Sequence, residues 1–106
     1  MVRISAVYVS RDGAKFDLDY YCGPHTAFAT RVLGPYGLVS IRVLEGVRSL
    51  DGGAPAFRAI SEMIFSNFEG FERAMAEQGQ ALFSDLANCT DITPILQVCR
   101  LAMDER

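Results

Sequence analysis

Apolar side chains alternate with polar or smaller ones along short stretches of the chain, which is the pattern of strands that bury one face. Residues 2–9, Val-Arg-Ile-Ser-Ala-Val-Tyr-Val, show this alternation and are rich in β-branched side chains. In a second stretch Val39, Ile41 and Val43 share one face, and Ser40 and Arg42 share the other. The predicted strands cover residues 2–9, 36 to about 47, 56–65 and 95 to about 103.

A helix is predicted between the first two strands, and both of its ends are marked. Asp17 is a good N-cap, because its carboxylate can accept the free backbone N–H groups of the first turn. Phe16 and Tyr21 occupy the two positions of a hydrophobic staple, which fixes how the chain enters the helix. Gly34 is a C-terminal stop signal, so the helix is predicted to reach Leu33.

One face of this helix carries apolar side chains together with His25, the only histidine of the protein. At about 100° per residue, this face has His25 near its centre, Tyr21 at its border, and Leu18, Cys22, Phe28, Ala29 and Val32 around them, whereas Tyr20 and Arg31 point away. A histidine there is either a core residue bonded to a backbone carbonyl or a functional residue, and the pattern leaves both interpretations open. Pro24 lacks an N–H, so a kink or restart there would shift the face.

A second helix is predicted after the third strand, from a capping box in which Ser66 precedes Glu69 by three residues. Apolar side chains at helical spacing form a core-facing stripe, namely Phe68, Phe71 and Met75. Gly79 is interpreted as the end of this helix. A separate short helix over residues 80–86 and a turn over residues 88–91 are predicted to follow.

The order of elements is strand, helix, strand, strand, helix, strand, within a single domain that spans residues 1–106. This is the ferredoxin-like α+β arrangement, βαββαβ, in which two helices cover one face of a four-stranded antiparallel sheet. The other face mixes apolar side chains with Arg, Glu and Ser, and a small sheet with a half-apolar open face needs covering. We therefore expect a homodimer in which two sheets pack face to face.

Composition excludes several classes of function. The formal net charge is −3 and there is no basic run, so nucleic acid is not an expected partner. No run typical of a signal peptide and no span of about 18 apolar residues occurs, so a membrane is not an expected partner either. Three widely spaced cysteines argue against a disulfide framework and favour the reducing cytoplasm. With one histidine and no C-x-x-C spacing, no metal site is expected.

Five short motifs follow one another along nearly the whole chain. They are Phe16-Asp17-x-Asp19-Tyr20-Tyr21-x-x-x-His25, Leu33-Gly34-Pro35, Gly53-Ala54-Pro55-Ala56-Phe57, Phe65-Ser66-x-Phe68-Glu69-x-Phe71 and Asp85-x-x-Asn88-x-Thr90-Asp91-x-x-Pro94-x-x-Gln97. This series resembles the EthD family, which is named after ethyl tert-butyl ether degradation and belongs to the dimeric α/β-barrel superfamily. The chain departs from the family at Gly23-Pro24, which implies a changed presentation of the histidine, and at Cys89, which implies a reshaped cavity mouth.

The resemblance implies a dimeric α/β barrel whose small organic ligand lies between the sheet and the helices of each subunit. Superfamily members include cofactor-free monooxygenases, lactone isomerases, cyclases and dehydratases, so no metal, flavin or haem is expected as a cofactor. Similar proteins are often encoded with degradative enzymes. Because a shared fold does not carry a shared reaction, the resemblance leaves open whether this chain is an enzyme.

Two hypotheses on function follow. In the first, the protein binds a small, largely apolar, oxygenated molecule, and His25 is the general acid/base because imidazole exchanges protons readily near neutrality. The candidate substrate-binding residues are Tyr8, Tyr21, Cys22, Phe28, Asn88 and Gln97. In the second, the protein is a non-catalytic dimer that binds a metabolite or assists an oxygenase system, and Tyr20, Tyr21 and His25 form a structural cluster. An apolar cavity beside His25 would favour the first hypothesis, and a packed histidine bonded to backbone would favour the second.

Overall fold

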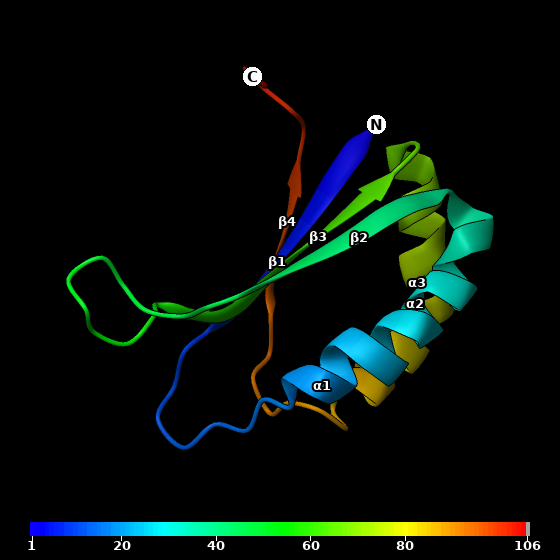
Figure 1. Cartoon of the computed structure of the whole chain (residues 1–106). Helices are drawn as coiled ribbons and strands as arrows, with labels where there is room; N and C mark the ends of the chain where they lie inside the picture. Colours follow the sequence, from blue (N-terminus) through cyan, green and yellow to red (C-terminus); the bar gives the residue numbers. More distant parts are fainter. Residues whose placement is uncertain (106) are drawn as a thin grey trace.

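Four strands form one antiparallel sheet, and the helices cover a single face of it (Figure 1). The computed structural model describes residues 1–105. Its elements are, in chain order, β1 (Val2–Val9), α1 (Leu18–Tyr20), a π-helical turn η1 (Tyr21–His25), α2 (Thr26–Leu33), a 3₁₀ turn η2 (Gly34–Tyr36), β2 (Leu38–Glu45), β3 (Phe57–Phe65), α3 (Phe68–Leu86) and β4 (Ile95–Cys99). The strands pair in the order β2-β3-β1-β4. The predicted ferredoxin-like arrangement is therefore confirmed.

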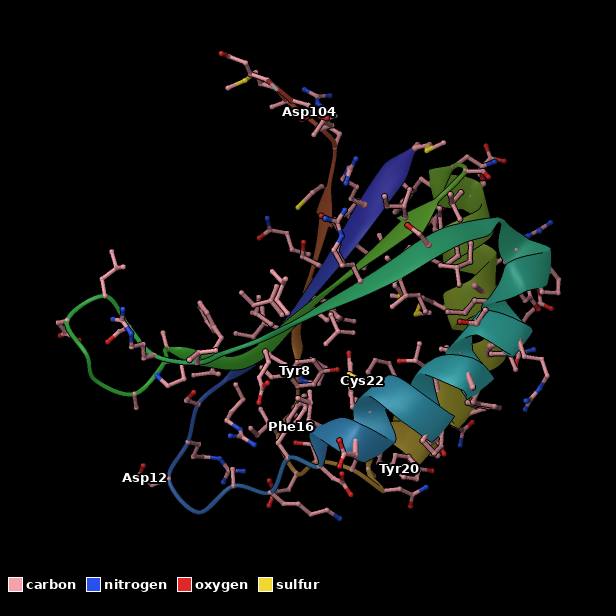
Figure 2. All side chains as sticks on the ribbon, in the orientation of Figure 1. Tyr8, Asp12, Phe16, Tyr20, Cys22 and Asp104 are labelled. Carbon is pink, nitrogen blue, oxygen red and sulfur yellow. The ribbon has the colours of Figure 1, made fainter. Side chains whose placement is uncertain are left out.

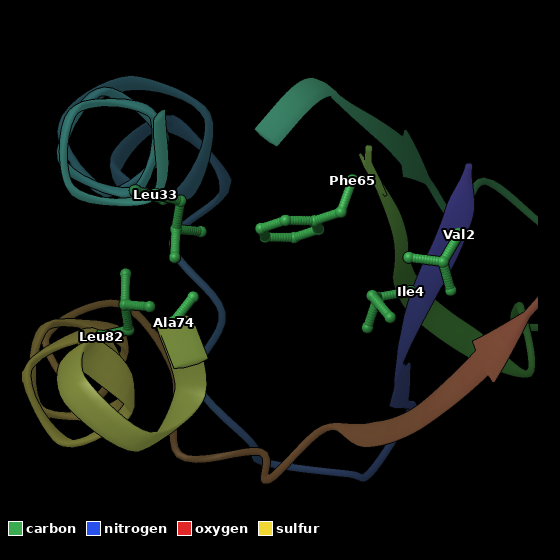
Figure 3. Packing of buried hydrophobic residues seen from close by; sticks show 7 residues of the cluster. Val2, Ile4, Leu33, Phe65, Ala74 and Leu82 are labelled. Atoms are coloured by element: carbon green, nitrogen blue, oxygen red, sulfur yellow. The ribbon is translucent and has the colours of Figure 1, made fainter. Parts of the chain in front are cut away.

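The alternation along β1 places every second side chain under the helices. Its buried residues are Val2, Ile4, Ala6 and Tyr8, and the buried residues of the neighbouring strand β3 are Ala59, Ser61 and Phe65. Figure 3 shows core residues of the two layers facing one another, with Val2, Ile4 and Phe65 on the sheet and Leu33, Ala74 and Leu82 on the helices. Burying a large apolar side chain contributes about 1.5–3 kcal/mol, so these contacts fix the helices on the sheet.

The first helix begins as the sequence predicts. The side chain of Asp17 accepts the N–H of Tyr20 at 3.1 Å, which confirms the N-cap. The rings of Phe16 and Tyr21 lie 5.4 Å apart between centroids, which confirms the staple. Tyr21 is thereby fixed with its ring toward the sheet, where it also contacts Tyr8.

The helix widens at Pro24. Because proline has no N–H, the regular bond from this position is missing, and the N–H of Thr26 reaches back to the carbonyl of Tyr21. The hydroxyl of Thr26 donates to the same carbonyl at 2.7 Å. The wider turn shifts the buried face, so that Tyr21 is buried and Cys22 is exposed. The prediction that Cys22 lies on the apolar face is therefore wrong, because Pro24 changes the helical phase.

α3 is one continuous helix of 19 residues, and both of its predicted boundaries are wrong. Asn67, not Ser66, is the N-cap, because its side chain accepts the N–H of Gly70 at 2.8 Å. The hydroxyl of Ser66 donates instead to the carbonyl of Gly37, at 3.3 Å. Gly79 is buried inside the helix, where packing outweighs its cost of about 1 kcal/mol relative to alanine. Neither α3 nor any other helix in residues 1–105 has the length and apolar content to cross a membrane.

β2 and β4 are shorter than predicted. The pairing of β2 with β3 is irregular between Leu38 and Ser40. This irregularity turns Val39 to the surface, where it is 52% exposed, while Leu38 packs against the core. β4 ends at Cys99, and the residues after it form no strand up to residue 105.

The face of the sheet opposite the helices is not covered by any part of residues 1–105. Arg3 contacts Glu62 there, with Nη1 and Oε1 3.0 Å apart. Apolar side chains share this face: Val7 on β1 pairs with Ile60 on β3 and with Ile95 on β4. The mixture of charged and apolar residues is the one that the alternation predicts.

Candidate functional site

A cavity of about 80 Å³ lies between the inner face of the sheet and the helices. Its wall is mainly aliphatic and aromatic, and the polar members of the wall are Tyr8, Tyr21, His25, Thr26 and Ser61. Phe83 and Leu96 also line it and are 46% and 42% exposed, so they mark where the cavity opens to the surface. An apolar cavity beside His25 is therefore present.

His25 is bonded to α3 through a pair of side chains. Its Nδ1 lies 2.8 Å from Oδ2 of Asp85, and the two side chains are 12% and 22% exposed. The hydrogen bond from His25 lowers the pKa of Asp85, so the carboxyl group is ionised and accepts the proton of Nδ1. The second ring nitrogen, Nε2, is then the basic nitrogen of the neutral imidazole.

Asp85 is in turn fixed by two neighbours. Its Oδ1 accepts the hydroxyl of Tyr20 at 2.8 Å and the side-chain amide of Asn88 at 3.3 Å. The bond to Asp85 raises the pKa of Tyr20, since the protonated phenol donates a hydrogen bond to the carboxylate. Tyr20 therefore does not point away into solvent as the helical projection predicts. Asn88 lies outside the cavity wall and contacts the site only through Asp85 and Tyr20.

Nε2 of His25 forms no hydrogen bond within residues 1–105. Since no buried side-chain nitrogen or oxygen in these residues lacks a partner, Nε2 has accessible surface. The ring that carries it lines the cavity. An imidazole held by a carboxylate on one nitrogen, with the other nitrogen free, can take up and release a proton.

Two tyrosines form the polar part of the cavity wall next to His25. The hydroxyl of Tyr8 donates to the hydroxyl of Tyr21 at 3.1 Å, and the ring of Tyr21 lies 5.3 Å from that of His25. Burial raises the pKa of both tyrosines, so both are neutral phenols. Figure 2 shows Tyr8 beneath the sheet beside Phe16, whose ring contacts it edge-on at 5.1 Å.

Besides Asn88, three more of the predicted binding residues lie outside the cavity wall. Cys22 is exposed because the wider helical turn at Pro24 shifts the buried face of the helix. Phe28 packs against the core with the guanidinium of Arg31 5.3 Å from its ring centroid. Gln97 pairs with Ser5 on the outer face of the sheet, whereas its neighbour Leu96 pairs with buried Ala6 on the inner face.

The cysteines have no direct place in this site. Cys22, Cys89 and Cys99 are free thiols. Cys89 is fully buried, and its Sγ contacts the carbonyl of Leu86 at 3.2 Å, so it fastens the turn after α3 and does not shape the cavity mouth. Within residues 1–105 no three His, Cys, Asp or Glu side chains lie together in a group that could hold a metal ion.

Asp85 and Ser61 are site residues that sequence reasoning missed. Asp85 is the first residue of the motif that ends at Gln97. Because the sequence predicts that the helix ends at Gly79, it does not predict that Asp85 lies opposite His25. Ser61 is the single hydroxyl residue on the apolar face of β3. A lone hydroxyl on such a face is a weak sequence signal that the residue contacts another polar group in the interior.

Comparisons with known proteins find structures of the same fold. An EthD-like protein from Ralstonia eutropha JMP134 is 32% identical, with a TM-score of 0.89, over 98% of this chain and 94% of that one. An EthD family protein from Bacillus halodurans C-125 is 23% identical, with a TM-score of 0.68, over 92% and 96%. SnoaB, a cofactor-independent oxygenase from Streptomyces nogalater, is 15% identical, with a TM-score of 0.62, over 98% and 97%. No protein-family profile matches the sequence, and no curated protein does.

Proposed function

Since this chain belongs to the EthD family, we propose that it binds a small, largely apolar, oxygenated organic molecule in the cavity, with His25 as the general acid/base. The observation that carries the proposal is the position of the imidazole. It lines the cavity, and its Nδ1 is bonded at 2.8 Å to the Asp85 carboxylate rather than to a backbone carbonyl. A carboxylate partner fixes the proton on Nδ1 and leaves Nε2 facing the cavity, an arrangement suited to proton exchange with a ligand.

The pair can move a proton without a cofactor. Nε2 accepts a proton from the ligand, the Asp85 carboxylate stabilises the imidazolium that forms, and Nε2 returns the proton to another atom of the ligand. Isomerisation and dehydration are reactions of this kind. A monooxygenase reaction would also require dioxygen as a second substrate. The fold shared with a cofactor-independent oxygenase supports chemistry of this class. We propose a degradative or tailoring pathway as its setting, as the resemblance to the EthD family implies.

We also propose that the protein is a homodimer that joins two outer sheet faces. The uncovered face with Val7, Ile60 and Ile95 supports this assembly, since apolar side chains in one row gain from burial. Interfaces of obligate dimers bury about 2,000 Å² or more in total. The three free thiols support a reducing compartment such as the cytoplasm.

A second candidate function is binding without catalysis, as a carrier of a metabolite or an accessory of an oxygenase system. The observation in its favour is that the bonds of Asp85 to His25 and Tyr20 join η1 to the end of α3. The same bonds would stabilise the helical layer even if no proton were ever exchanged.

One substitution, His25→Asn, separates the two functions. For a proton carrier we expect a thermal midpoint close to that of the wild type and turnover of the natural substrate reduced about a hundredfold. For a structural residue the free energy of unfolding falls by about 1–3 kcal/mol while ligand affinity stays the same. The substrate for this test is the organic molecule that co-purifies with the protein, identified by mass spectrometry. A destabilised variant with unchanged affinity would end the catalytic interpretation.

A further inference from the structure

The cavity favours an uncharged ligand, because its wall carries no side chain of fixed charge. The titratable groups in the wall are His25, Tyr8 and Tyr21. Burial raises the pKa of both phenols, so they keep their protons, and any positive charge on His25 already faces the Asp85 carboxylate. A carboxylate or an ammonium group would lose its hydration in the cavity without gaining a partner.

Tyr21 has a proton to offer to such a ligand. Its oxygen accepts the hydroxyl proton of Tyr8, and the hydroxyl of Ser61 also interacts with it and lowers its pKa. Among residues 1–105 no carbonyl or carboxylate oxygen accepts a hydrogen bond from the Tyr21 hydroxyl. Hydrogen bonds accepted by a phenol oxygen polarise its O–H and make it a better donor. The proton of Tyr21 is therefore available to an acceptor atom of a ligand in the cavity.

Tyr21 and His25 can act on neighbouring atoms of one molecule. They are the first and last residues of η1, their ring centroids are 5.3 Å apart, and both line the cavity. A ligand oxygen at the Tyr21 hydroxyl brings the adjoining carbons toward the imidazole. Ser61, from the sheet, also lines the cavity, and its hydroxyl interacts with the Tyr21 oxygen.

From this arrangement, and on the basis of the function proposed above, we propose that the ligand is a neutral carbonyl compound with a hydrogen on the carbon next to the carbonyl. The hydroxyl of Tyr21, polarised by Tyr8 and Ser61, binds the carbonyl oxygen, and His25 removes the adjacent hydrogen as a proton. Ketones, esters and lactones belong to this class.

The step balances without any further reagent. The C–H bond breaks, its proton passes to Nε2 of His25, and its electron pair forms the C=C bond of an enolate. The electron pair of the C=O π bond moves to the oxygen, whose negative charge is bound by the hydroxyl of Tyr21. Return of the proton from Nε2 to the same carbon regenerates the ligand, and return to a conjugated carbon gives an isomer. Nothing is oxidised or reduced.

The size of the cavity limits what can enter it whole. A volume of about 80 Å³ is roughly half that of the cavity of about 150 Å³ that admits benzene. A small ketone fits, and a larger ligand would place its carbonyl end inside and extend past Phe83 and Leu96 at the opening. Acetone is therefore a suitable probe for the carbonyl site.

The test measures the exchange of acetone hydrogens for deuterium in D₂O by proton NMR. We expect the wild-type protein to accelerate exchange over buffer, and Tyr21→Phe to slow it about a hundredfold, the effect of losing one donor to a developing oxyanion. Tyr36→Phe is the matched control, since its hydroxyl donates to Glu77 at the surface, and it is expected to exchange acetone at the wild-type rate. If Tyr21→Phe fails to fold, Ser61→Ala removes one donor to the Tyr21 oxygen, makes its O–H a weaker donor, and is expected to slow exchange in the same direction.

Two results would overturn the carbonyl site. One is a folded Tyr21→Phe protein that exchanges acetone as fast as the wild type. The other is a wild-type protein that does not accelerate exchange but binds 2-propanol, an alcohol of similar size, in the cavity. The second result would still support the proposed binding of a small oxygenated molecule. It would refute only the carbonyl class of the ligand and the removal of a proton by His25.

Discussion

His25 Nδ1 and Asp85 Oδ2 lie 2.8 Å apart, although 60 residues separate them in the chain. The π-helical turn at Pro24 presents the imidazole, and the uninterrupted course of α3 past Gly79 brings the carboxylate to it. The two halves of the helical layer meet at this bond, beside the cavity. This hydrogen bond places the proton of the neutral imidazole on Nδ1 of the only histidine.

Replacing Asp85 by asparagine should reduce proton exchange at His25. An amide cannot stabilise an imidazolium by charge, so we expect Asp85→Asn to slow acetone exchange about tenfold or more. Glu77→Gln is the control on the same helix, because Glu77 accepts the Tyr36 hydroxyl at the surface and does not line the cavity. Equal exchange rates for Asp85→Asn and wild type would show that the carboxylate does not assist His25.

Acid should remove the stabilising contribution of Asp85. Its pKa is lower in the folded protein, chiefly through the bond from His25, than the ordinary value of about 3.9 in the unfolded chain. The unfolded chain therefore binds more protons in this range, and the contribution is complete above about pH 4 and lost as the pH falls through the folded pKa. Urea unfolding of wild type and Asp85→Asn should show a stability difference at about pH 5 that vanishes toward about pH 2. A difference that is constant over this range would contradict the bond.

The fold follows from the sequence because it depends on local patterns. The alternation of residues 2–9 and the cap at Asp17 determine strand and helix within a few residues of themselves. The site does not follow so directly. The π-helical turn η1 holds one extra residue, which rotates Cys22 and His25 relative to the buried face. Asp85, the partner of His25, comes from the C-terminal end of α3, which continues past Gly79. Such pairs depend on tertiary packing, which no local pattern specifies.

Thiol chemistry should distinguish Cys22 from Cys89. Cys22 is exposed and Cys89 is fully buried, so Ellman's reagent should modify Cys22 in the native protein and Cys89 only after unfolding. Partial desolvation of the thiol and the nearby carboxylates of Asp19 and Glu45 raise the pKa of Cys22, so its reaction should still accelerate as the pH rises above 8.5, roughly the ordinary thiol value. Cys22→Ser should remove this reaction and leave acetone exchange unchanged, since the thiol lies outside the cavity wall. Rapid native labelling of Cys89 would be inconsistent with the buried turn.

The outer sheet face should determine the oligomeric state. We expect light scattering at micromolar concentration to give about twice the chain mass of 11.7 kDa. Ile95→Glu places a charge on that face and should shift the protein to monomers. Ala76→Glu, at an exposed position of α3 in the helical layer, is the control and should leave the mass unchanged. A wild-type protein that runs as a compact monomer would refute the dimer.

The ring nitrogens of His25 give the most direct measurement of the central claim, which is that this imidazole holds its proton on Nδ1 and offers Nε2 to the cavity. Because the chain has one histidine, ¹⁵N labelling of histidine yields a single imidazole whose two nitrogens are read by long-range proton–nitrogen NMR. The neutral ring is predicted to be protonated on Nδ1 and bare on Nε2, and the Nε2 signal is predicted to move when acetone is added. A ring protonated on Nε2, or an Nε2 signal that ligand leaves unchanged, would contradict the account.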